Sequence, residues 1–160
     1  MGNCGMYISS SSEYLTDESV KKFNVKVVPS GTILYSFKLT IGRVAIADGE
    51  LTTNEAIAHF QREGNNHKEY LYCYLKTFDH QTLGNTSSIA TAVNSKTIKA
   101  MQIVLPDSTM LEKFHTIAFP MFEQIRSNLQ ESKRLTTLRD TLLPRLMSGE
   151  LSVSDLPDVS

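Results

Sequence analysis

The residues of this chain that most often carry chemistry are its histidines and cysteines, and they form no recognisable site. The four histidines share no ligand spacing with one another or with Cys4 and Cys73, whereas zinc sites need closely spaced pairs of such ligands. We therefore expect no metal, and we expect surface or boundary positions for His59, His67, His80 and His115. The cysteines follow no disulfide pattern and are expected to be reduced thiols.

Other catalytic patterns are also missing from the sequence. Gly31 and Gly42 stand alone, and Gly84 lacks the lysine of a phosphate-binding loop. Asp107 with the later Glu131-Ser132-Lys133 resembles a nuclease motif only superficially, because the second half falls in a long helical pattern and not on an adjacent strand. No serine or cysteine triad is supported by spacing. We expect no cofactor and no catalytic residues, so an enzyme reading has no named residues behind it.

Two groups of small polar residues near basic ones remain. The first is one predicted turn with Lys38, Thr40 and Arg43; the second is a loop followed by Lys96, and the loop residues are Asn85, Thr86, Ser87 and Ser88. Hydroxyl and amide groups hydrogen-bond phosphates and base edges, while Lys and Arg neutralise phosphate. These residues are therefore candidates for DNA binding, although ordinary solvated loops have the same composition.

The elements that must position these groups are mostly short strands. Strands are expected at residues 25–28, 33–37, 44–47, 55–60, 89–93 and 102–105, with Asp48-Gly49 as a hairpin turn. An amphipathic helix is expected at 68–78, and shorter helical turns are expected after Thr16 and after Asn94 or Ser95. Residues 1–12 offer little to fold upon. The pattern predicts an α+β unit with a small curved sheet and one packed helix.

The tail from Thr109 to about Met147 reads as one long helix. Thr109 and Glu112 suggest a capping box, Gly149 marks the end, and Pro120 is expected to kink or split the helix. At 1.5 Å per residue it would be roughly 58 Å long. Its apolar stripe is expected to form a protein interface through Leu111, Phe114, Met121, Ile125, Leu135, Leu138, Leu142, Leu143 and Leu146. We expect it to protrude and pair as an antiparallel coiled coil; the alternative is a helix folded onto its own domain.

Composition limits the partners. The chain has 160 residues and a net charge of −1, so bulk charge does not announce nucleic-acid binding. No run is long enough to span a membrane and no secretion signal is evident, so a cytoplasmic protein is expected.

Several segments resemble the specificity (S) subunit of type I restriction–modification systems. Residues 28–38 (VPSGTILYSFK), 39–46 (LTIGRVAI) and 53–57 (TNEAI) resemble part of its target-recognition domain. Residues 138–151 (LRDTLLPRLMSGEL) resemble the end of its helical spacer. The family's domain normally begins some tens of residues earlier, and a full subunit carries two such domains, so the chain resembles a C-terminal fragment.

The resemblance implies a division into a partial target-recognition domain at 1–106, a helical spacer at 107–149 and a flexible tail at 150–160. It implies a non-catalytic subunit that reads half of a bipartite double-stranded DNA site. It also implies docking of methyltransferase (M) subunits and, through the complex, the restriction (R) subunit, with possible self-association through the helix. The alternative is a remnant that interacts through its helix and does not bind DNA.

Overall fold

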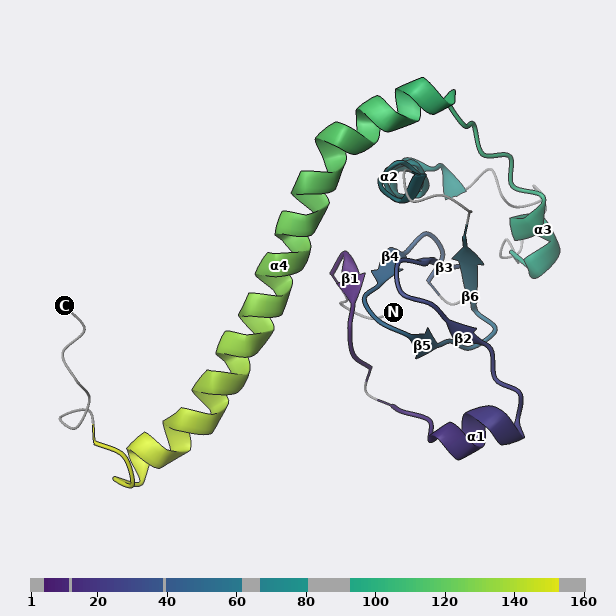
Figure 1. Ribbon diagram of the computed structural model, residues 1–160. Helices are drawn as coiled ribbons and strands as arrows, with labels where there is room; N and C mark the ends of the chain where they lie inside the picture. Colours follow the sequence, from purple (N-terminus) through teal and green to yellow (C-terminus); the bar gives the residue numbers. More distant parts are fainter. Residues whose placement is uncertain (1–4, 12, 39, 62–66, 81–92, 153–160) are drawn as a thin grey trace. The chain divides into compact units, whose positions relative to one another are not determined.

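The computed structural model describes residues 5–11, 13–38, 40–61, 67–80 and 93–152 (Figure 1). Short strands and helices precede one long helix, which confirms the α+β class. The elements are β1 (Tyr7–Ile8), α1 (Asp17–Lys22), β2 (Val27–Val28), β3 (Ile33–Ser36), β4 (Val44–Ala47), β5 (Leu51–Thr52), β6 (Ile57–Phe60), α2 (Lys68–Thr77), α3 (Ser95–Lys99) and α4 (Ser108–Met147). The strand expected at 89–93 lies outside the described residues except for Val93.

Four strands form the main sheet in the order β1-β4-β3-β6. β3 pairs antiparallel with β4 and with β6, while β1 pairs parallel with β4. The expectation that residues 1–12 have little to fold upon is therefore wrong. A two-residue strand gives too short a pattern for sequence reading, and its pairing partner lies some forty positions away.

A second, two-stranded sheet is made of β2 and β5. The expected hairpin at Asp48-Gly49 is wrong, because β4 stays in the main sheet and β5 pairs with β2. Gly49 has φ +118, a conformation that suits glycine, and its amide donates to the Ser30 hydroxyl. The turn thus passes the chain from one sheet to the other.

The side chains on the two faces of β3 belong to two different apolar clusters, because successive side chains of a strand point to opposite faces. Ile33 and Tyr35 face the larger cluster, which includes Leu75 of α2, and Figure 1 draws α2 beside β3 and β4. Leu34 faces the smaller cluster with Val28 and Ala47. The sheet is therefore covered on both faces.

The segment between α3 and α4 is extended but forms no strand, so the strand expected at 102–105 is wrong. Its backbone bonds go to side chains: the Tyr70 hydroxyl donates to the Val104 carbonyl at 2.6 Å, and the Tyr74 hydroxyl donates to the Gln102 carbonyl at 3.5 Å. Two tyrosines of α2 thus replace a neighbouring strand. Of the two expected caps, Asn94 and Ser95, Asn94 caps α3 by accepting from the amides of Lys96 and Thr97.

α4 is a single helix of 40 residues that begins at Ser108 (Figure 1). Asp107 caps it by accepting from the Met110 amide at 2.9 Å, so the capping box at Thr109 is wrong. The helix is not split at Pro120, because a proline removes one amide donor while the bonds on either side remain. It ends as expected at Gly149, whose φ is +76.

The chain divides into two compact units, Met1–Phe122 and Glu123–Ser160, and α4 contributes to both. Within the first unit, Leu111, Ala118 and Phe122 of α4 are buried. In the described part of the second unit, residues 123–152, no side chain is buried. No helix among the described residues has the length and apolarity needed to cross a bilayer.

Candidate nucleic-acid interface

The connection between β3 and β4 is a closed turn on the surface of the first unit. The Ser36 amide donates to the Arg43 carbonyl at 2.9 Å, and the Gly42 amide donates to the Ser36 carbonyl at 3.0 Å. Gly42 has φ +86, which favours glycine. The sequence therefore closes this turn through its own backbone; Leu39 lies outside the described residues.

Lys38, Thr40 and Arg43, the candidates of the first group, all lie exposed on this turn. The Lys38 ammonium pairs with Glu55 at 3.0 Å, with 42% and 82% of the two side chains exposed. The pKa of Glu55 is lowered first by a hydrogen bond with its own backbone and then by Lys38. The turn offers cationic and hydroxyl groups to solvent, and one cation already has an acidic neighbour.

The second group of candidates is only partly described. Asn85, Thr86, Ser87 and Ser88 lie outside the described residues. Lys96 lies exposed on α3, in the turn that follows the Asn94 cap. The described residues therefore leave Lys96 as the visible member of this group.

Sequence reading missed a histidine and a tyrosine that lie beside the turn. His80 follows α2, and its Nδ1 lies 2.7 Å from the hydroxyl of buried Tyr35. A Cβ added to Gly42 would collide with the His80 imidazole ring. Burial raises the pKa of Tyr35 to about 12. The contact between positions 42 and 80 has no signal in spacing or composition.

The other histidines also have specific surroundings. His59 Nε2 lies 2.7 Å from the Thr53 hydroxyl, and burial, followed by nearby Lys26, lowers the pKa of His59. His115 Nδ1 of α4 lies 2.9 Å from a carboxylate oxygen of Glu69, whose side chain is fully buried in α2. Within the described residues, no group of three or more His, Cys, Asp or Glu side chains is placed to hold a metal ion.

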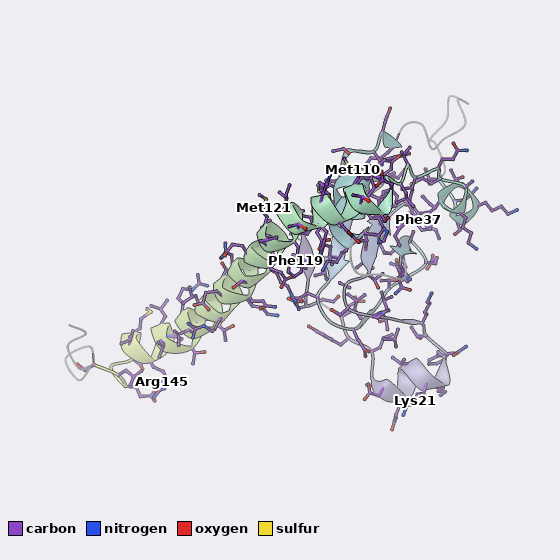
Figure 2. The ribbon with its side chains drawn as sticks, turned by 45° about the horizontal axis from the view of Figure 1, so that its top comes forward. Lys21, Phe37, Met110, Phe119, Met121 and Arg145 are labelled. Carbon is purple, nitrogen blue, oxygen red and sulfur yellow. The ribbon has the colours of Figure 1, made fainter. Side chains whose placement is uncertain are left out.

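The first part of α4 has apolar side chains on two faces. Buried Leu111, Ala118 and Phe122 follow one helical stripe and belong to the first unit's core. A second stripe is exposed and contains Met110, Phe114, Ile117, Met121 and Ile125. Figure 2 labels Met110, Phe119 and Met121 along this part of the helix. Of the candidate interface residues, Leu111 is therefore inside its own domain, whereas Met121 is 61% exposed.

The remaining interface candidates lie on the second unit's part of α4. Leu135, Leu138, Leu143 and Leu146 are exposed, and Leu142 is intermediate. Ion pairs join Arg134 to Glu131 within α4, and Arg145 of α4 to Glu150 just after the helix. The surface of this segment therefore mixes exposed leucines with paired charges.

Comparisons with known proteins identify a matching family and two relatives. A family model described as the type I restriction modification DNA specificity domain matches residues 3–131. The chain is 28% identical over 150 residues to the type I restriction enzyme HindI specificity subunit of Haemophilus influenzae, covering 91% of this chain and 33% of that protein. It is 29% identical over 154 residues to the type I restriction enzyme MjaIX specificity subunit of Methanocaldococcus jannaschii, covering 91% and 35%. The chain thus spans about a third of these relatives' length.

Proposed function

Because this chain belongs to the type I restriction modification DNA specificity domain family, we propose that it is a DNA-reading part of a type I restriction–modification complex and performs no chemistry of its own. The observation that carries this proposal is the match over residues 3–131, which spans both sheets, α2, α3 and the start of α4. The relatives' names give the same role, that of a specificity subunit.

Within this proposal, residues 1–106 are a target-recognition domain that reads one half-site of double-stranded DNA. The exposed turn with Lys38, Thr40 and Arg43 contacts the phosphate backbone, which positions a protein on the duplex without reading sequence. Lys96 adds a further cation. Asn85, Thr86, Ser87 and Ser88 read base edges, because amides and hydroxyls both donate and accept hydrogen bonds.

In the same proposal, residues 107–149 form the helical spacer, and residues 150–160 form the C-terminal tail. The exposed stripe of α4 supports a partner helix, because leaving Met110, Ile117 and Met121 in water forgoes the free energy of burying them. We assign that partner to an antiparallel helix of a second recognition half, giving a coiled coil. A helix of 40 residues is about 60 Å long, more than one ~34 Å turn of DNA. Leu138, Leu142, Leu143 and Leu146 would dock the methyltransferase subunits, which link the restriction subunit.

A salt titration of DNA affinity tests the proposed reading domain. Each counterion-releasing phosphate contact contributes about 0.9 to the slope of log K against log salt. Lys38→Ala and Arg43→Ala should each lower the slope by about that amount for every sequence tried. Lys133→Ala, an exposed lysine on the second unit's helix, is the matched control and should leave the slope unchanged. Unchanged slopes for both turn variants would remove the turn from the interface.

Sedimentation of the unmodified chain tests the proposed helix pairing. Met121→Asp with Ile125→Asp should abolish self-association, because pairing would then bury unpaired carboxylates. Phe114 suits the test less well, because its ring also packs edge-on against Tyr70 of its own unit, with the ring centroids 6.1 Å apart. Thr116→Asp adds a carboxylate at an exposed position of the same helix that is not three or four residues from any member of the exposed stripe, and it should leave association intact. A monomeric wild-type chain at high concentration would contradict pairing between copies.

A second candidate function is a protein-interaction module that does not hold DNA. The near-neutral net charge of −1 and the pairing of Lys38 with Glu55 favour it. The salt titration of DNA affinity distinguishes the two candidate functions when it is performed with and without methyltransferase subunits. The interaction module predicts co-purification through α4 with no salt-dependent DNA binding in either condition.

A further inference from the structure

The turn that carries Lys38 and Arg43 is tied to the sheet mainly at its ends. The Ser36 amide bonds the Arg43 carbonyl, and the Phe37 amide bonds the Ala56 carbonyl at 3.0 Å. In its middle, the hydroxyls of Thr40 and Ser36 lie 3.3 Å apart. Backbone bonds at the ends of a turn do not by themselves hold its middle in one conformation.

The His80 ring supplies a rigid surface for that middle. A Cβ at Gly42 would meet Nε2 and both adjacent ring carbons, so the Gly42 backbone lies directly on the imidazole edge. Only glycine fits there, both for its φ of +86 and for the absent side chain. The approach is closer than any other residue type allows.

The Tyr35 hydroxyl contacts the other nitrogen of that ring. Tyr35 is fully buried in β3, and its hydroxyl lies 2.7 Å from His80 Nδ1. With its pKa raised to about 12, Tyr35 stays protonated at neutral pH. For the proposal below we adopt the tautomer in which the Tyr35 hydroxyl donates to Nδ1. In that tautomer a neutral ring has its proton on Nε2, which is the ring atom nearest to a Cβ built on Gly42.

We propose that His80, oriented by Tyr35, is a positioning residue that holds residues 40–43 of this turn in their DNA-binding conformation. This inference rests on the proposed function, because it concerns how the phosphate-contacting turn is presented. A turn that is ordered before binding loses less conformational entropy in the complex. His80 itself touches no DNA in this arrangement; its effect passes through the Gly42 backbone.

A double-mutant cycle in DNA binding tests the positioning role. The full chain is titrated with a mixed-sequence duplex as wild type, His80→Ala, Arg43→Ala and the pair. His80→Ala should weaken binding several-fold, and adding Arg43→Ala should cost less than it does alone, because the released turn no longer holds Arg43 in place. Ile33→Val, a core truncation at the far end of β3, is the control for lost stability and should bind DNA as wild type does.

The outcomes separate the inference from the function on which it rests. If Arg43→Ala weakens binding while His80→Ala behaves as Ile33→Val does, the positioning role is wrong and the turn remains a DNA contact. If neither Arg43→Ala nor Lys38→Ala changes binding, the turn is no interface, and the inference falls with it. Should His80→Ala fail to fold, Tyr35→Phe, which removes only the hydroxyl, takes its place in the cycle.

The proton assignment gives an independent spectroscopic test. Nitrogen chemical shifts of the His80 ring at neutral pH should show protonated Nε2 and unprotonated Nδ1 in the wild type. Tyr35→Phe should shift the ring toward a mixture of tautomers and weaken DNA binding in parallel. The proposal would be overturned if the wild-type ring is protonated on Nδ1. It would also be overturned if Tyr35→Phe alters the ring's chemical shifts but leaves the DNA affinity unchanged.

Discussion

The contact between His115 of α4 and Glu69 of α2 predicts a large cost when only one partner is removed. The Glu69 side chain has no solvent exposure, and its Oε2 lies 2.9 Å from His115 Nδ1. Its other oxygen has no hydrogen-bond partner among the described residues, and the nearest cation is Lys68 at 3.7 Å. Replacing His115 by Leu therefore leaves a buried carboxyl group with little compensation.

Breaking a buried pair typically costs about 3–5 kcal/mol. The His115 side chain is 23% exposed and Lys68 stays nearby, so we expect His115→Leu to cost about 2–3 kcal/mol of unfolding free energy. Replacing both partners, in Glu69→Leu with His115→Leu, should recover most of this loss to within about 1 kcal/mol, because no buried carboxyl group is then left without its partner.

Urea unfolding followed by tyrosine fluorescence measures the effect. All six tyrosines precede residue 75 and the chain has no tryptophan, so the signal reports the first unit. With a urea slope of about 1–2 kcal/mol per M, the expected midpoint shift is about 1–3 M. Lys113→Leu, an exposed position two residues earlier, is the control. A His115→Leu cost below about 0.5 kcal/mol, or a double variant as unstable as the single one, would refute the reasoning.

Three further results are expected. Glu55→Gln should tighten non-specific DNA binding by releasing Lys38, and the gain should vanish in a Lys38→Ala background; equal affinities would contradict competition between Glu55 and phosphate. His59 has a pKa below its ordinary 6.5 when folded, so its contribution to stability is complete above pH 6.5 and is lost as the pH falls through that value toward the folded pKa. Unfolding measured at about pH 7.5 and about pH 5.5 should differ less in His59→Gln than in the wild type. Burial, with Glu69 adding to it, raises the pKa of Cys73, so in a Cys4→Ser chain this thiol should alkylate more slowly at neutral pH when folded than in urea.

Local patterns predicted much of the fold. The bounds of the strand at 44–47 and the helix at 68–77 were close because apolar runs and 3.6-residue periodicity are properties of consecutive residues. Thr16 was identified as a cap, and Asn94 as one of two candidates with Ser95, because capping acts within three residues. The specificity-subunit resemblance was confirmed by the family match.

The errors share a physical cause, which is competition among partners distant in sequence. β1 exists because its backbone meets β4, and residues 102–105 are not a strand because tyrosine hydroxyls take their carbonyls. The predicted cap was Thr109, whereas the structure caps α4 with Asp107, two residues earlier. The His80–Gly42 contact is invisible for the same reason, since position 80 shares no periodic pattern with position 42.

Burial is uneven along α4, so side-chain packing within the domain stabilises the first part of this continuous helix but not the second. Residues 108–122 are anchored by buried Leu111, Ala118 and Phe122, whereas residues 123–147 have no buried side chain to support them. Because helices gain most of their stability from packing, amide hydrogen exchange should quicken along α4 from its start toward Gly149. A bound helix or subunit should slow exchange beyond Phe122 more than before it. Exchange rates along this single helix would then report where on it a partner is bound.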